Sequence, residues 1–96
     1  NEGNRLMSSS FDVRVISGSK EEVNQVLISV SKNKVKSAVK RNLIKRRVRE
    51  SYRINKHSII KKGLKIGIVY SKSKIMNYQE INKSIENIIK KINSND

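Results

Sequence analysis

Residues 40–53 read Lys-Arg-Asn-Leu-Ile-Lys-Arg-Arg-Val-Arg-Glu-Ser-Tyr-Arg, a stretch that combines dense positive charge with the residue types of a helix. Residues 38–52 contain no Gly or Pro, and Leu, Arg, Lys and Ala are good helix formers. Ser37 has a side chain suited to an N-cap. The stretch therefore predicts a helix that begins near residue 38 and ends within 55–59, with the other elements as its support.

Two sides of this helix differ in chemistry when residues are placed at about 100° intervals. The packing side carries Ile44, Val48, Ser51, Tyr52 and Asn55. The cationic side carries Asn42, Lys45, Arg46, Arg49 and Arg53. A solvated helix face would normally mix charges of both signs, but Glu50 is the only acid between Glu22 and Glu80. The unbalanced charge favours an anionic partner over an ordinary solvated face.

The whole chain shows the same bias, with a net charge of +14 over 96 residues. One domain with a modest core is expected at this length. The charge predicts a partner that is nucleic acid or an anionic membrane surface. No apolar run approaches the roughly 20 residues of a bilayer span. The absence of cysteine excludes disulfides and thiolate metal sites, and it fits a reducing cytoplasm.

The remaining elements follow from the spacing of apolar residues. Residues 1–10 are polar and predict a loose arm or a short edge strand. Residues 11–16 and 23–30 alternate at period two, which predicts two strands paired as a hairpin across a turn at 17–22. Residues 64–70 are largely apolar and predict an interior strand.

A second helix is predicted over residues 78–92, where isoleucines recur at helical spacing, as is typical of core. The stripe consists of Ile81, Ile85, Ile88, Ile89 and Ile92. The order strand, strand, helix, strand, helix predicts an α+β fold, an α/β sandwich in which helices pack on a small sheet. We expect the helix at 38–55 to connect two strands of that sheet.

Residues for catalysis are scarce. His57 is the only histidine, and at a helix end it is typical of a surface residue or of a partner of the helix dipole. A metal site would need clustered His, Cys or carboxylates, whereas the acids are scattered and Glu21 with Glu22 fits a turn. No Gly-rich phosphate loop occurs. We therefore expect no catalytic residue, cofactor-binding residue or metal ligand in this chain.

Two segments carry a resemblance to a known family. Residues 28–32 read Ile-Ser-Val-Ser-Lys, and residues 38–49 read Ala-Val-Lys-Arg-Asn-Leu-Ile-Lys-Arg-Arg-Val-Arg. Together they resemble the signature of the bacterial ribonuclease P protein subunit, a strand ending in Val-Ser-Lys followed by a helix reading Ala-Val-x-Arg-Asn-x-x-Lys-Arg-x-x-Arg. The order of elements also agrees, so the resemblance covers nearly all of residues 1–96, expected to be a single RNA-binding domain.

The resemblance implies a fold and an activity. The Arg-Asn helix would join parallel strands by a left-handed crossover, an exception to the usual right-handed rule. The chain would be the protein subunit of an endoribonuclease that removes the 5′ leader of precursor tRNA in the cytoplasm. Its partners would be the catalytic RNA and precursor tRNA, with no membrane and no obligate protein partner. Catalysis would belong to the RNA, with Mg2+ held by RNA and substrate rather than by protein ligands.

The resemblance also implies which residues meet RNA. The RNA-binding helix would contribute Lys40, Arg41, Asn42, Lys45, Arg46, Arg49 and Arg53. A cleft between that helix and the sheet would hold the single-stranded leader. The residues on the strands bordering this cleft would be Phe11, Arg14, Ser31 and Lys32.

Three departures from the family pattern are visible. Members usually carry a basic stretch and an amphipathic helix ahead of the segment matching residues 1–3, so one wall of the leader cleft is expected to be incomplete here. Arg14 stands where members often have an aromatic residue, although a guanidinium also stacks on a base. The connection at 33–37 is one residue longer than in many members and lacks their usual glycine.

Three other functions share parts of the pattern. A structural RNA-binding protein of ribosomal type would have the same charge and size but no role in tRNA processing. A membrane-surface helix would need Trp, Phe or Leu on its apolar face, which Ser51 and Asn55 interrupt here. A helix-turn-helix DNA reader would need another helix just before residue 38, which the sequence does not predict.

Overall fold

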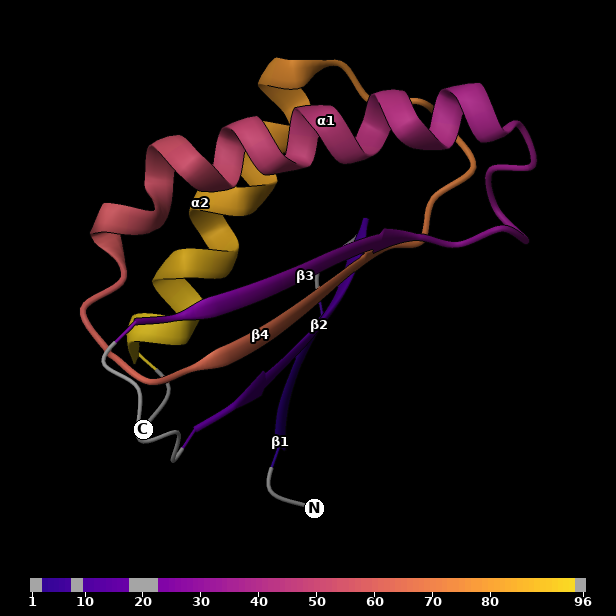
Figure 1. The fold of residues 1–96 in the computed structure, drawn as a ribbon. Helices are drawn as coiled ribbons and strands as arrows, with labels where there is room; N and C mark the ends of the chain where they lie inside the picture. Colours follow the sequence, from indigo (N-terminus) through magenta and orange to yellow (C-terminus); the bar gives the residue numbers. More distant parts are fainter. Residues whose placement is uncertain (1–2, 8–9, 18–22, 95–96) are drawn as a thin grey trace.

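The computed structural model describes residues 3–7, 10–17 and 23–94, which form a sheet with two helices on one face (Figure 1). The strands are β1 (Gly3–Met7), β2 (Phe11–Ile16), β3 (Gln25–Val30) and β4 (Lys65–Tyr70). The helices are α1 (Ala38–Asn55) and α2 (Tyr78–Ser94), and a 3-10 turn, η1 (Lys56–Ser58), follows α1. The predicted α+β sandwich is confirmed.

The sheet has the strand order β1-β2-β4-β3. β2 is antiparallel to both of its neighbours, β1 and β4, while β3 is parallel to β4. The prediction that 64–70 is an interior strand is confirmed, and β1 is the edge strand allowed for in 1–10. The predicted hairpin between 11–16 and 23–30 is wrong, because β4 lies between these two strands. Strands that are neighbours in sequence often pair, but here β4, which comes later in the chain and is largely apolar, pairs with both of them.

The start of β3 also differs from the prediction, since the strand begins at Gln25 rather than at residue 23. The side chain of Asn24 explains this, because its Nδ2 donates to the carbonyl of Lys61 (3.0 Å) and its Oδ1 accepts from the amide of Leu64 (2.9 Å). These bonds tie Asn24 to the segment before β4 instead of extending the ladder. Most of the turn predicted at 17–22 lies outside the described residues.

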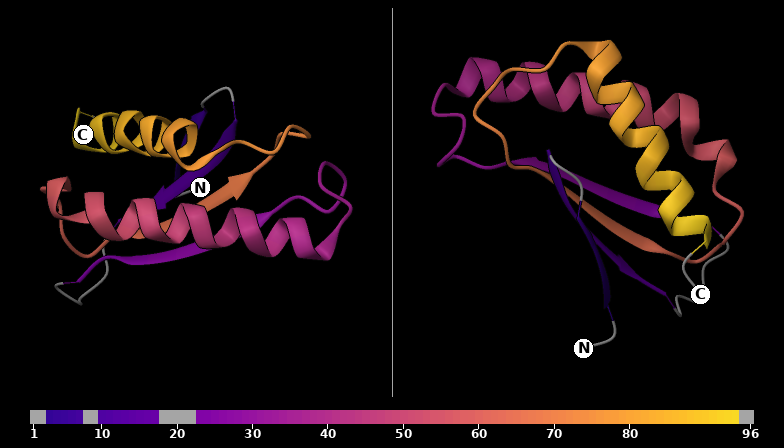
Figure 2. Two further views of the ribbon diagram at one scale, coloured as in Figure 1. Left: turned by 90° about the horizontal axis from the view of Figure 1, so that it is seen from above. Right: turned by 180° about the vertical axis from the view of Figure 1, so that it is seen from behind.

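The connection from β3 through α1 to β4 is a left-handed crossover. Seen from the helix side and along the strand direction, β4 lies to the left of β3 (Figure 2, left). Right-handed crossovers are the rule for parallel strands. The crossover places α1 over β3 at one edge of the sheet, beside α2, which reaches β2.

The core lies between the sheet and the helices. Alternate residues of β2 and β4 face it and are buried: Phe11, Val13, Val15, Ile66, Ile68 and Tyr70. The whole predicted isoleucine stripe of α2 is buried against them. The rings of Phe11 and Tyr70 meet edge to face, with centroids 5.4 Å apart. Aromatic packing of this kind fixes the end of the sheet from which the connections to both helices leave.

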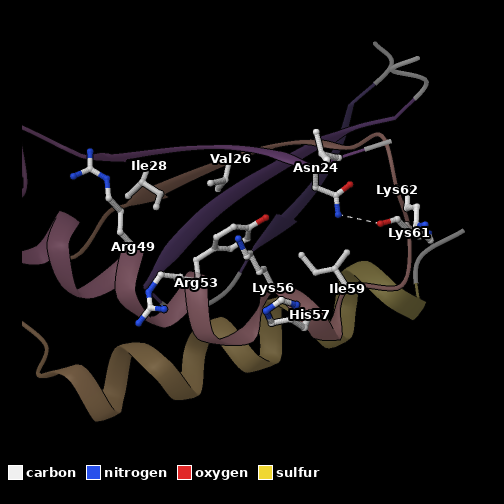
Figure 3. A pocket seen from close by; sticks show the side chains of 12 residues that line it. Asn24, Val26, Ile28, Arg49, Arg53, Lys56, His57, Ile59, Lys61 and Lys62 are labelled. Atoms are coloured by element: carbon white, nitrogen blue, oxygen red, sulfur yellow. Dashed lines mark hydrogen bonds between the residues drawn. The ribbon is translucent and has the colours of Figure 1, made fainter. Parts of the chain in front are cut away.

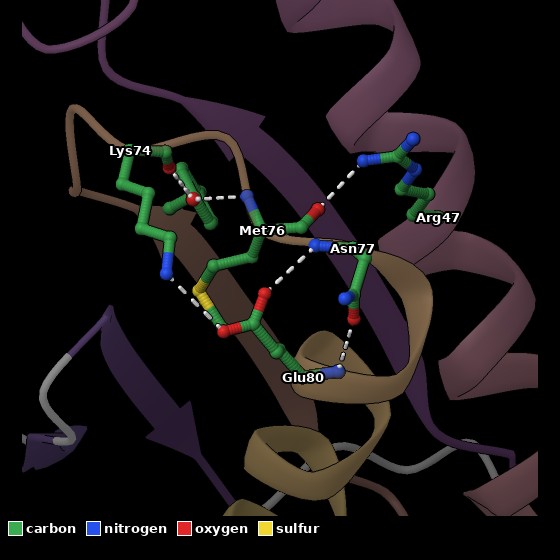
Figure 4. A network of polar contacts seen from close by, with 6 residues as sticks. Arg47, Lys74, Met76, Asn77 and Glu80 are labelled. Carbon is green, nitrogen blue, oxygen red and sulfur yellow. Dashed lines mark hydrogen bonds and ion pairs between the residues drawn. The ribbon is translucent and has the colours of Figure 1, made fainter.

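Hydrogen bonds from α1 and from the end of β4 hold the connection between β4 and α2 (Figure 4). Arg47 Nη1, from α1, donates to the carbonyl of Met76 at 2.6 Å. The hydroxyl of Tyr70 donates to the carbonyl of Lys74 and accepts from the amide of Met76 (3.3 Å). Arg47 is therefore engaged in holding this connection, and it does not belong to the exposed cationic side of α1.

Candidate nucleic-acid interface

The cationic side of α1 is positioned by the opposite, buried side of the same helix. Ser37 caps the helix by accepting a 3.3 Å hydrogen bond from the Lys40 amide. Ile44 and Val48 are fully buried, so the residues on the other side of the helix face solvent. No acid occurs in the first turn, and the helix dipole adds positive potential at that end.

The structure brings the predicted RNA-binding residues together on α1. Lys40, Asn42, Arg46, Arg49 and Arg53 are exposed, whereas Arg41 and Lys45 are half-buried. We call the exposed residues together with Lys45 the α1 stripe. Among the described residues, no side chain forms a hydrogen bond or ion pair with the side chains of Lys40, Asn42, Lys45, Arg46 or Arg49. Their donors are therefore available to phosphate oxygens.

Two of the predicted residues have internal partners. Arg41 Nη1 donates to the carbonyls of Val35 (3.0 Å) and Lys36 (2.9 Å), so Arg41 anchors the connection that enters α1. Arg53 forms a two-point contact with Glu50, at 2.6 Å and 3.3 Å. The hydrogen bonds from Arg53, aided by its charge, lower the pKa of the Glu50 carboxyl. Arg53 thus offers less net charge to an external anion than Arg46 or Arg49.

The residues predicted to border the leader cleft do not line one hollow. Phe11 is only 1% exposed and lies in the core, so its ring offers no surface to an RNA base in this conformation. Arg14 is exposed on the opposite face of the sheet, in a shallow hollow of about 320 Å³ that it shares with Leu27 and Lys65. Ser31 is half-buried and Lys32 exposed, just beyond the end of β3.

A groove does lie between the sheet and this helix, bordered by β3 and the C-terminal half of α1, but none of the four residues predicted for the leader cleft lines it (Figure 3). Its volume is about 600 Å³, and Tyr52 and Ile59 form part of its wall. Burial raises the pKa of the Tyr52 phenol. The basic residues at 56–62 were the one signal in the sequence for these lining residues, but their proximity to residues 23–28, at the start of β3, depends on the crossover.

The described residues form neither a metal-binding cluster nor a membrane span. No group of three or more His, Cys, Asp or Glu gathers there in a way that could hold a metal ion. Neither helix in the described part of the chain has the length and apolar character needed to cross a membrane.

The comparisons with known proteins all point to one family. The family model described as Ribonuclease P matches residues 1–93. The ribonuclease P protein component of Macrococcus caseolyticus is 41% identical over 88 residues, which cover 92% of this chain and 75% of that protein. That of Clostridioides difficile is 36% identical over 88 residues, which cover 91% of this chain and 76% of that protein.

Solved structures agree in fold. The ribonuclease P protein from Thermotoga maritima superimposes with a TM-score of 0.81 and 27% identity, covering 95% of this chain and 84% of that chain. The Staphylococcus aureus protein gives a TM-score of 0.78 and 29% identity, covering 92% and 79%. With the strand-to-helix signature, the sheet order and the α1 stripe in place, these matches establish that the chain belongs to the bacterial ribonuclease P protein family.

Proposed function

We propose that this chain, as the protein component of ribonuclease P, binds the catalytic RNA through the α1 stripe and assists removal of the 5′ leader of precursor tRNA in the cytoplasm. One observation carries the proposal. The side chains of four cations on α1 have no hydrogen-bond or ion-pair partner among the described residues: Lys40, Lys45, Arg46 and Arg49. The neutral side chain of Asn42 lies on the same side of the helix and is likewise unpartnered there. Family membership favours this function over the ribosomal-type alternative, which explains the charge equally well.

The stripe would act by electrostatics and positioning. Arg46 and Arg49 present planar forks that match phosphate oxygens, and Lys40 and Lys45 act as point charges. Bringing two RNAs together brings two rows of phosphates together, and cations on α1 offset the repulsion between them. Holding substrate and catalytic RNA in one geometry lowers the entropic cost of reaction. We expect no obligate protein partner for this step.

Bond cleavage would belong to the RNA. Magnesium ions bound to RNA and substrate would supply a polarised nucleophile and stabilise the leaving oxygen. The side chains of the described residues suit a different task, because the stripe offers nitrogen donors for phosphates rather than clustered oxygen ligands for a metal. The chain's contribution is therefore to tighten the binding of substrate and ions through charge.

Leader binding would use the open face of the sheet, where Arg14 lies. A guanidinium can stack on an unpaired base, and exposed Leu27 beside it in the hollow adds apolar surface. Lys32, exposed beyond the end of β3, would extend the positive field along the strand. Phe11 would act indirectly, by supporting β2 from the core.

The test is cleavage of a precursor tRNA by a bacterial ribonuclease P RNA at low magnesium, with and without the full-length protein. We expect the protein to restore cleavage at the mature 5′ end. An Arg46→Ala/Arg49→Ala variant should restore less, whereas Lys83→Ala, a charge loss on the exposed side of α2, should restore as much as wild type. Tight RNA binding by the full-length protein without restored cleavage would favour the ribosomal-type alternative.

A further inference from the structure

One edge of the sheet is open at β3. In the strand order β1-β2-β4-β3, β3 pairs only with β4, so its other side has no neighbouring strand in the described part of the chain. Proteins usually protect such an edge with charged side chains or a bulge. β3 reads Gln-Val-Leu-Ile-Ser-Val and has no charged residue, although 31% of the whole chain is charged. Its register with β4 also runs without a bulge, so the edge is suited to pairing with another strand.

The ladder between β3 and β4 shows which backbone groups of β3 point outward. The amide of Gln25 donates to the Leu64 carbonyl at 2.8 Å, so the backbone of Gln25 is turned toward β4. Successive residues of a strand turn their amides and carbonyls alternately to its two sides. Val26 and Ile28 therefore present these groups on the open side, where no residue in the described ranges bonds to them.

Apolar surface lies on both sides of this open edge. On the helix side, the groove between β3 and α1 runs beside the strand, and the half-buried side chains of Val26 and Ile28 line it (Figure 3). On the opposite face of β3, Leu27 is 75% exposed. A strand added at the edge would point its side chains alternately to these two surfaces, so each of its faces would find apolar contacts.

The rim of the groove is cationic. Arg49, Lys56 and Lys62 are exposed and line it, and no acidic side chain does so among the described residues. Tyr52 also lines the groove; its side chain is 8% exposed, and its hydroxyl forms no hydrogen bond within the described ranges. The phenol and the three cations are all donors that suit a carboxylate. The charge complementary to this rim is therefore that of acidic side chains.

We propose that the open edge of β3 binds an extended, acidic segment of a partner protein by strand addition. The backbone of the segment exchanges hydrogen bonds with Val26 and Ile28. Its side chains on the helix side enter the groove, where carboxylates meet Lys56 and Lys62. Its other side chains lie beside Leu27. The partner is an accessory one, because the proposed function requires no protein partner.

Two other occupants fit the edge less well. RNA would place phosphates against the outward carbonyls of Val26 and Ile28, on a strand that carries no cation. A second copy of this chain would supply a strand, but it would bring together two chains of net charge +14. Only another polypeptide alternates backbone donors and acceptors at the spacing of a strand, roughly 3.3 Å per residue. An acidic segment adds the opposite charge to that match.

The inference does not depend on the proposed function. Arg49 and Arg53 belong both to the α1 stripe and to the lining of the groove. Lys56 and Lys62 line the groove but lie outside the stripe, so the edge can be tested without altering the stripe. Peptide binding and precursor cleavage are therefore separate readouts, and either can fail while the other succeeds.

The first experiment measures, by fluorescence anisotropy, the binding of the full-length protein to a labelled ten-residue peptide of alternating glutamate and valine. A second peptide of the same sequence, methylated at every backbone nitrogen, keeps the charge but cannot donate hydrogen bonds to β3. We expect the methylated peptide to bind at least about 10-fold more weakly, because two or more hydrogen bonds are lost. Equal binding of the two peptides, or no binding of the first, would overturn the proposal.

Protein variants separate the groove from general charge attraction. Lys56→Ala/Lys62→Ala should weaken binding of the unmethylated peptide about 3- to 10-fold. Lys83→Ala/Lys90→Ala removes the same charge from the exposed side of α2 and should change binding less than about 2-fold. Equal losses in the two double variants would show that the peptide responds only to net charge, and the site at β3 would be rejected.

Hydrogen exchange followed by NMR locates the bound strand. In the free protein the amide of Leu27, which faces β4, should exchange slowly, and the amides of Val26 and Ile28 should exchange rapidly. The unmethylated peptide should slow exchange at Val26 and Ile28, whereas a single-stranded RNA should not. Unchanged exchange with the peptide, or equal slowing by RNA, would reject a protein partner. Slowing that increases with protein concentration in the absence of peptide would assign the edge to a second copy instead.

Discussion

The hydroxyl of Ser51 donates a 2.7 Å hydrogen bond to Oδ1 of Asn82, joining the buried side of α1 to α2. Asn55 Nδ2 donates to the same oxygen at 2.8 Å and to the Ser51 carbonyl at 2.8 Å. The two polar residues that interrupt the apolar side of α1 therefore share one acceptor on α2. Buried polar groups are tolerated when they are bonded in this way.

Replacing Asn82 with Ala should lower the free energy of unfolding by about 1 to 3 kcal/mol, because the donors of Ser51 and Asn55 lose their shared acceptor. Urea unfolding followed by circular dichroism would measure the change. Asn87→Ala, on the exposed side of α2, should stay within about 0.5 kcal/mol of wild type. Matching losses in the two variants would contradict a role for the network.

Shortening Ile85 to Ala should lower the free energy of unfolding by about 2 to 5 kcal/mol through lost burial and a residual cavity. Ile85 is 0% exposed in the stripe of α2. Ile54 is 53% exposed on α1, so Ile54→Ala is the matched control and should change stability far less. A thermal melt of Ile85→Ala that overlaid that of wild type would refute its place in the core.

Gly63 and Gly67 should respond in opposite ways to alanine. Gly63 has a φ of 71°, a region that costs a residue with a Cβ about 1 to 2 kcal/mol, so Gly63→Ala should lower the melting temperature. At Gly67 a new Cβ would lie 4.0 Å from the Arg14 carbonyl, an ordinary contact. Gly67→Ala should therefore be neutral or slightly stabilising. Equal melting temperatures for the two variants would contradict the backbone argument.

Much of the fold could be predicted because local patterns encode it. The isoleucine spacing at 81–92 and the helix-forming run at 38–55 specify both helices and the side of each that is buried. Strand order is not local in this sense. Nothing within 11–16 or 23–30 shows that β4 will lie between them, because strand order depends on the tertiary packing of segments far apart in the sequence.

The same difference between local pattern and tertiary packing holds for the candidate site. The α1 stripe could be predicted, since helical spacing alone places Arg46 and Arg49 on one side. The internal roles of Arg41 and Arg47 could not, because their carbonyl partners belong to connections whose paths depend on tertiary packing. A run of arginines therefore shows where charge lies but not which guanidinium groups are already engaged.

Acid should weaken the start of α2 through Glu80. The Asn77 amide donates to Glu80 (3.1 Å), and the Glu80 amide donates back to Asn77 Oδ1 (2.9 Å), a reciprocal cap (Figure 4). The bond from the Asn77 amide, helped by Lys74 at 3.5 Å, lowers the pKa of the Glu80 carboxyl below its ordinary value of 4.5. A depressed pKa means that the stabilisation is complete above the unfolded-state pKa and is lost as pH falls through the folded-state pKa.

Glu80→Gln keeps an acceptor oxygen but removes the titrating charge, so it isolates this effect. Wild type should have the higher melting temperature at pH 6, and the difference should shrink as pH falls below 4.5, the ordinary carboxyl pKa. Melting curves of both proteins over this range would measure it. A difference that stayed constant with pH would show that the charge of Glu80 plays no part in the cap.

Removing the charge of Arg46 should reduce the salt dependence of RNA binding as well as the affinity. Each phosphate contact on a duplex contributes about 0.9 to the slope of log K against log salt, so Arg46→Ala should flatten the slope by roughly that amount if it makes one contact. Dissociation constants for the ribonuclease P RNA over a series of KCl concentrations would give the slope. Lys83→Ala lowers the net charge equally but lies on α2, so its slope should match that of wild type. If Arg46→Ala kept the full slope, the contact would not be with phosphate, and the argument that the α1 stripe exists to neutralise RNA would fail at its central residue.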